Sequence, residues 1–166
     1  MLFTLLEHLD KNSGFPVAKA HCDIPCGIYD PISAQLAALT VIRTVDLLND
    51  LAEKDSLTVN EQAQFGRLVA EKESHGLKVK EEVRVIWGDY FKPPHFEDMP
   101  ELQTLCHSIM MAASKAKQHV SREAAGELLT LVNEFAAAFW KTKGVETYTA
   151  ECPYAPNEMV VYPKLG

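Results

Sequence analysis

Two cysteines and a histidine lie close together near the amino end of the chain. Cys22 directly follows His21, and three residues separate Cys22 from Cys26. Thiolates and imidazoles bind metal ions, and a close pair of thiols can also form a disulfide or act as a redox switch. The spacing alone therefore leaves a zinc site, a disulfide and a redox switch open.

The residues before His21 resemble a cleavage signal. Ala18-Lys19-Ala20 matches the A-x-A pattern, but residues 1–20 lack the basic start and the unbroken apolar core of an export signal. We therefore expect residues 1–20 to be a removable leader that does not target a membrane.

Cleavage after Ala20 would give His21 a free amine beside the amide nitrogen of Cys22. The amine, the deprotonated amide and the Cys22 sulfur can close two adjacent five-membered chelate rings. The Cys26 sulfur can complete a plane of two nitrogens and two sulfurs, with the His21 imidazole in an axial position. Tetragonal sites with nitrogen ligands favour nickel or copper over zinc, and this site could cycle by one electron.

Composition narrows the class of protein. A chain of 166 residues that is 47% hydrophobic can form one domain with a sizeable core. No apolar run is long enough to cross a bilayer, so no membrane partner is expected. The net charge of −7, without a Lys/Arg block, argues against nucleic acid as a partner. Four cysteines do not make a disulfide scaffold in a chain of this size, which favours a reducing, cytoplasmic location.

Apolar residues recur every three or four positions in four segments between residues 31 and 144, as in amphipathic helices. Because short connections favour antiparallel neighbours, the sequence predicts an all-α protein, an antiparallel four-helix bundle over residues 31–144. Residues 21–30 would form an N-terminal metal-binding hook, and residues 145–166 an irregular, extended C-terminal tail. The helix start signals are Asp30, Thr58, Asp98 with Glu101, and Ser121.

Two motifs resemble one known family. HCDIPCGIY at residues 21–29 resembles the nickel hook at the mature amino terminus of nickel superoxide dismutases, and WGDYFKPPHFE at residues 87–97 resembles that family's segment between two helices. The resemblance runs to about Gly144. It implies one nickel ion per chain, a homohexamer of four-helix bundles, and a leader that a dedicated peptidase removes after Ala20. It also implies dismutation of superoxide to oxygen and hydrogen peroxide by Ni(II)/Ni(III) cycling.

The resemblance also implies roles for single residues. His21 would supply the amine and the axial imidazole, Cys22 its amide nitrogen and thiolate, and Cys26 a second thiolate. Tyr29 would stand over the open face of the metal, with Tyr90 supporting it by hydrogen bonding. Lys92 would draw superoxide in against the overall negative charge.

This chain departs from the better-known bacterial pattern at two positions. Those members hold the axial imidazole with a Glu in the first helix and an Arg in the second, where this chain has Ala37 and His75. The hold on His21 is therefore expected to differ. His95 is interpreted as a structural hydrogen-bonding group and Cys106 as a small buried hydrophobe.

A second class of function uses the same cysteines. A non-catalytic nickel or copper carrier, or a thiol-based redox sensor, could be built on Cys22 and Cys26. The requirement for a free amine separates the two classes. Dismutation needs the amine of His21, whereas a thiol sensor would work in an uncleaved chain.

Overall fold

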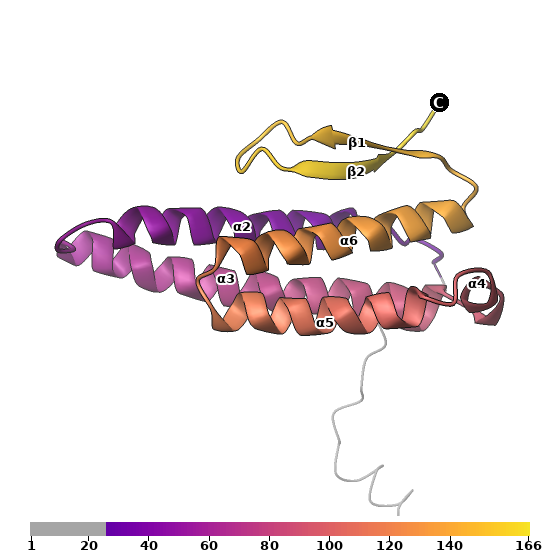
Figure 1. Ribbon diagram of the computed structural model, residues 1–166, viewed down its shortest axis with the longest axis horizontal. Coiled ribbons are helices and arrows are strands. Elements are labelled where there is room, and N and C mark those ends of the chain that lie inside the picture. Colours follow the sequence, from indigo (N-terminus) through magenta and orange to yellow (C-terminus); the bar gives the residue numbers. More distant parts are fainter. Residues whose placement is uncertain (1–25) are drawn as a thin grey trace, which may run out of the picture.

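The computed structural model describes residues 26–166 and is mostly helical, as the sequence predicts. Four long helices lie side by side along their length (Figure 1). The helices are α2 (Ile32–Ala52), α3 (Val59–Val85), α5 (Leu102–Gln118) and α6 (Arg122–Thr142). A π-helical turn η1 (Ile86–Tyr90) and a short helix α4 (Pro93–Asp98) connect α3 to α5, and two strands follow α6, β1 (Thr147–Glu151) and β2 (Met159–Pro163).

Helix starts follow the predicted signals at three of four positions. Asp30 Oδ1 accepts the N–H of Ile32 at 2.8 Å, and Ser121 Oγ accepts the N–H of Ala124 at 3.1 Å. Thr58 and Glu61 form a reciprocal capping box. Hydrogen bonds from Lys54 and then from Thr58 lower the pKa of the Glu61 carboxyl from 4.5 to about 2.

The fourth start differs from the prediction. Helix α5 follows Glu101, whose side chain makes no capping hydrogen bond, and Asp98 instead ends the short helix α4. Pro93 and Pro94 are the first two residues of α4. Proline suits the first turn of a helix because its missing N–H is not needed there. The connection between α3 and α5 therefore contains a short helix.

The four long helices bury one continuous apolar core. Its largest fully buried side chains include Phe135, Phe139, Ile42 and Leu128. Cys106 is 1% exposed, which agrees with its prediction as a buried hydrophobe, and burial raises the pKa of its thiol to about 12. Among residues 26–166, no helix is both long enough and apolar enough to cross a membrane.

The prediction of an irregular tail is wrong for residues 147–163. Strands β1 and β2 pair antiparallel, with Tyr148 opposite Tyr162, and their rings lie 5.7 Å apart. The hairpin lies over α2 and α6, on the side away from α3 and α5 (Figure 1). Val160 and Cys152 are buried by this packing. A short run of apolar residues at 159–162 was the available signal, but three prolines in the tail obscured it.

A polar clamp fixes the hairpin to the helices. Asn133 Nδ2 donates to the carbonyl of Met159 at 2.9 Å, and Asn133 Oδ1 accepts the N–H of Val161 at 3.2 Å. Gln35, 2% exposed, donates to Asn133 Oδ1 at 3.0 Å and to the Val161 carbonyl at 2.8 Å. Arg122 pairs with both Asp46 and Glu158, which joins α6 to α2 and to the hairpin.

Replacing Asn133 by Ala should loosen the hairpin while the helices stay folded. The change removes two bonds to β2 and leaves buried Gln35 with one fewer partner, at a cost of about 1–3 kcal/mol. Hydrogen exchange should therefore accelerate in residues 147–163 and change little in α3 and α5. Asn60→Ala, at an exposed position, is the control; equal protection of the hairpin in both variants would contradict the clamp.

Candidate metal centre and its tyrosine support

The predicted metal ligands lie at the edge of the described chain. His21 and Cys22 fall outside the described residues, and Cys26 is the first residue described, with an exposed side chain. The glycine after it, Gly27, has a φ of +69°, in the left-handed region that favours glycine. Two residues after Gly27, Tyr29 packs against the hydrophobic core of the helices.

Tyr29 and Tyr90 lie in contact, and the hydrogen bond predicted between them stays a prediction. Their ring centroids lie 5.5 Å apart, and both rings pack against the hydrophobic core. The sequence separates these residues by two long helices. The π-helical turn η1, at the end of α3, brings Tyr90 to the segment that precedes α2.

Tyr90 is enclosed by other rings. His95 stacks on it with centroids 5.6 Å apart and an interplanar angle of 16°, and Phe139 of α6 lies 4.8 Å away. Phe91 contacts the same ring at 5.3 Å. These contacts hold the ring between η1, α4 and α6, so that Tyr90 is a fixed support for Tyr29.

The last turn of α6 also reaches Tyr90. The Tyr90 hydroxyl lies 2.6 Å from Thr142 Oγ1, and the ammonium of Lys143 lies 4.6 Å from the centroid of the Tyr90 ring. A cation over an aromatic face is attracted to the ring. Neither Thr142 nor Lys143 is predicted as a site residue from the sequence. No local signal marks them, because their contacts with Tyr90 form only when α6 packs beside η1.

Lys92 and His95 lie next to this cluster. The backbone N–H of Lys92 donates to Nδ1 of His95 at 3.1 Å, which places the imidazole proton of neutral His95 on Nε2. This bond agrees with the structural role predicted for His95. The side chain of Lys92 is exposed, so that its charge is available near the tyrosine pair.

The two departures from the family pattern lie inside helices. Ala37 is 1% exposed in the core face of α2. His75 lies on α3, with its Nδ1 3.0 Å from the carbonyl oxygen of Glu71 and 3.3 Å from the Glu71 carboxylate. These contacts of His75 are with Glu71 of its own helix.

Within residues 26–166, no three His, Cys, Asp or Glu side chains gather as a metal-binding group. A nickel site that uses Cys26 would take its other ligands from the preceding residues, where the sequence has His21 and Cys22. Thiolates together with amine and amide nitrogens suit nickel. The donor set in the sequence therefore fits the metal.

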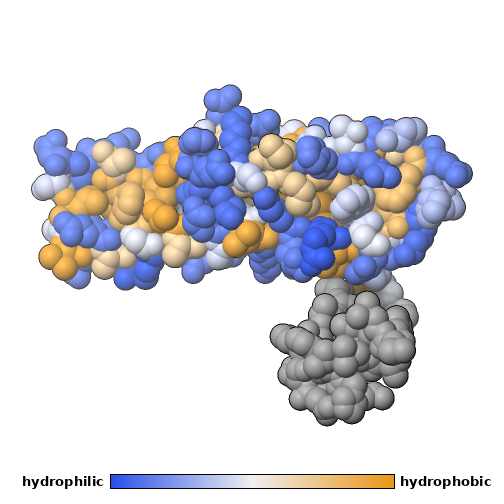
Figure 2. Space-filling model, turned by 90° about the horizontal axis from the view of Figure 1, so that it is seen from below, coloured by the Kyte–Doolittle hydropathy of each residue, from blue (hydrophilic) through white to orange (hydrophobic). Residues whose placement is uncertain are grey.

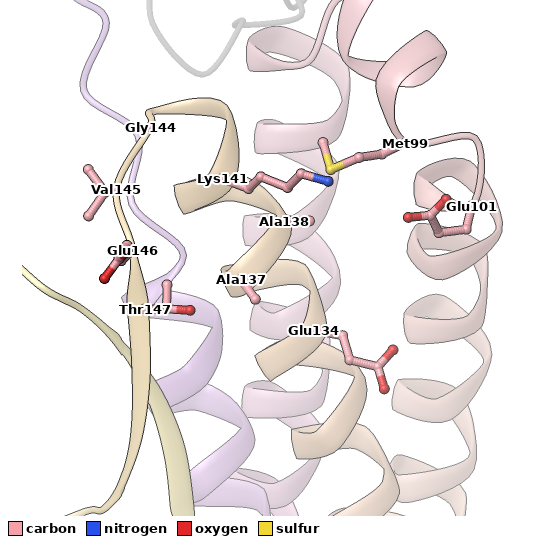
Figure 3. Close-up of a pocket in the computed structure, with 10 residues that line it drawn as sticks. All are labelled: Met99, Glu101, Glu134, Ala137, Ala138, Lys141, Gly144, Val145, Glu146 and Thr147. Atoms are coloured by element: carbon pink, nitrogen blue, oxygen red, sulfur yellow. The ribbon is translucent and has the colours of Figure 1, made fainter.

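A groove on the described chain lies away from the tyrosine pair. It runs between α6, β1 and the residues before α5, and Figure 3 shows Lys141 extending across it from α6. Three carboxylates line it, from Glu101, Glu134 and Glu146. None of the predicted site residues lies there, and an acidic groove repels an anionic substrate. The tyrosine pair, not this groove, is the candidate site.

Comparison with known proteins gives a consistent result. Residues 16–143 match the family model described as nickel-containing superoxide dismutase. The superoxide dismutases [Ni] of Streptomyces seoulensis and Streptomyces coelicolor are each 36% identical to this chain over 125 residues, which are 75% of this chain and 88% of theirs.

Solved structures agree with the sequence comparison. The native structure of a nickel superoxide dismutase superposes with a TM-score of 0.65 and 35% identity, over 75% of this chain and 99% of that one. An apo structure of the same kind of enzyme gives a TM-score of 0.62 at 32% identity. The matched residues include both motifs and end before the hairpin. The chain therefore belongs to the nickel-containing superoxide dismutase family.

Proposed function

We propose that this protein is a superoxide dismutase, which converts two superoxide ions and two protons into oxygen and hydrogen peroxide. The match of residues 16–143 to the family model carries this proposal, because the match contains the hook sequence and both tyrosines. The family favours this enzyme over the carrier and the thiol sensor, which share only the cysteines.

Nickel is the cofactor that the family implies, with one ion per chain. Bound nickel supplies a one-electron Ni(II)/Ni(III) couple, which thiolate and amidate donors bring within reach of superoxide. His21 would contribute its terminal amine and imidazole, Cys22 its amide nitrogen and thiolate, and Cys26 a thiolate. The short segment from Cys26 to Tyr29, turned at Gly27, ties these ligands to the helical body.

Tyr29 and Tyr90 would shape the approach to the metal, and Tyr29 would help to move protons. Tyr29 packs on Tyr90, and Tyr90 is held by α6, so neither ring can move without disturbing the core. A narrow approach also protects the thiolates, which peroxide can oxidise. Forming peroxide requires two protons, and a phenol is a suitable donor beside a water-accessible site.

Positive charge near the tyrosine pair would offset the repulsion of superoxide by a chain of net charge −7. Lys92 is exposed beside η1, and Lys143 lies over the Tyr90 ring. Lys92 directly precedes α4 and Lys143 directly follows α6, and these elements reach the same end of the molecule as the start of α2 (Figure 1).

Maturation and assembly follow from the family and are part of the proposal. A peptidase would remove residues 1–20, because in an intact chain the His21 nitrogen is an amide and cannot serve as the amine ligand. The four long helices would form the antiparallel bundle, with the hook at its end, of a cytoplasmic homohexamer. Assembly is supported by apolar surface that lies between hydrophilic side chains (Figure 2), and exposed apolar residues include Phe65, Leu77 and Met111.

Removal of residues 1–20 should switch the activity on. Nickel-treated full-length chain should dismutate superoxide poorly, and cleavage after Ala20 should raise kcat/KM by at least about a hundredfold, since the amine ligand appears only then. Pulse radiolysis before and after cleavage measures the change. High activity from a chain that keeps Met1 to Ala20 would contradict the proposed ligand set.

Cys26→Ser should abolish nickel binding without unfolding the protein, because Cys26 is exposed and lies outside the core. Circular dichroism should keep its helical signal while metal analysis finds nickel lost. Cys106→Ala is the matched control. Cys106 is buried, so this variant should lose about 1–2 kcal/mol of stability and still hold nickel. The reverse pattern would make Cys26 a structural residue.

Lys92→Met should lower kcat/KM for superoxide by roughly two- to fivefold at low salt, the size expected of one charge near an exposed site. The difference should shrink as ionic strength rises, because salt screens the charge. Lys78→Met, exposed on α3, removes the same charge elsewhere. Identical salt dependence in both variants would contradict the proposal that Lys92 attracts superoxide to the site.

A further inference from the structure

Two hydrogen bonds in series connect Tyr90 to the last turn of α6. The hydroxyl of Thr142 donates to the carbonyl oxygen of Phe139 at 2.6 Å, and the Tyr90 hydroxyl lies 2.6 Å from the same Thr142 Oγ1. A threonine hydroxyl carries one hydrogen. Because that hydrogen points to Phe139, Tyr90 must be the donor in its bond with Thr142.

The direction of this bond decides what Tyr90 presents to the site. Its only phenolic hydrogen is committed to Thr142, and its oxygen keeps lone pairs that can accept. The ring itself is fixed between His95 and Phe139, so the hydroxyl torsion is the remaining freedom. Thr142 removes that freedom. Tyr90 can therefore accept, and cannot donate, toward the groups around Tyr29.

We propose that Thr142 is a positioning residue of the dismutase site, which sets the Tyr90 hydroxyl as a donor toward α6 and leaves its oxygen as a fixed acceptor on the Tyr29 side. This role rests on the proposed function and on the 5.5 Å contact between the two tyrosine rings. A fixed acceptor holds a neighbouring proton donor in one orientation. Proton delivery to the product peroxide requires such an orientation.

The chain offers a matched control for Thr142. Thr130, on the same helix, donates to the carbonyl of Gly126 at 3.1 Å and is exposed. Replacing either threonine by valine keeps the side-chain shape and removes the hydroxyl. Only Thr142 also accepts a bond from a tyrosine, so that Thr130→Val reports the cost of losing a helix-face hydroxyl alone.

A double-mutant cycle tests the proposal in mature, nickel-loaded protein. Thr142→Val should lower kcat/KM about fivefold, which corresponds to ~1 kcal/mol for one hydrogen bond, and Thr142→Ser should restore it. Thr130→Val should leave it unchanged. In a Tyr90→Phe background, Thr142→Val should have no further effect. An equal loss in both backgrounds would overturn the proposal, because Thr142 would then act independently of Tyr90. Thr142→Ala replaces the valine variant if the latter does not fold.

A spectroscopic measurement separates this proposal from the proposed function. The tyrosine Fermi doublet in the Raman spectrum reports whether a phenol donates or accepts, and it needs no enzymatic activity. The wild-type spectrum of the full chain minus that of Tyr90→Phe isolates Tyr90. The Tyr90 contribution should be that of a donor, and Thr142→Val should abolish that character. A Tyr90 signal unchanged by Thr142→Val would overturn the role of Thr142, whereas an inactive wild-type protein would overturn only the dismutase assignment.

Discussion

The packing of Tyr90 against the end of α6 is the contact on which the candidate site depends. Its ring is held by Phe139 and His95, and its hydroxyl by Thr142. Tyr29 packs on this fixed ring, and Cys26 precedes Tyr29 by three residues. A segment this short has little apolar area of its own to bury. The contact of Tyr29 with Tyr90 therefore fixes the position of this segment on the helical core.

The C-terminal hairpin adds a second layer to a family fold. The match to the family ends at residue 143, and the chain then continues into β1 and β2. Docking rests on a small apolar contribution from Val160 and on the hydrogen bonds of Gln35 and Asn133. A two-stranded hairpin is marginal alone in water, so the helices supply most of what keeps it ordered. The hairpin covers α2 and α6, on the side away from α3 and α5 (Figure 1).

Local signals predicted much of the helical body, because capping chemistry and apolar periodicity act within a few residues. Thr58 with Glu61, and Ser121, mark their helix starts as expected. Prediction from the sequence was wrong where the structure of a segment depends on packing against distant parts of the chain. One proline pair begins α4, and a run of apolar residues among prolines forms most of β2. The tyrosine pair could be predicted from its motifs, but Thr142 and Lys143 could not. Their roles exist only through contacts across 52 residues of chain between Tyr90 and Thr142.

We propose that His21, once it is the amino terminus, completes a nickel site with Cys22 and Cys26. A native mass spectrum of protein purified from its own host is the sharpest test, because one measurement gives the start of the chain, the metal and the assembly. We expect chains that begin at His21, with one nickel ion each, in a sixfold assembly. A chain that begins at Met1 and carries stoichiometric nickel with full dismutase activity would contradict it.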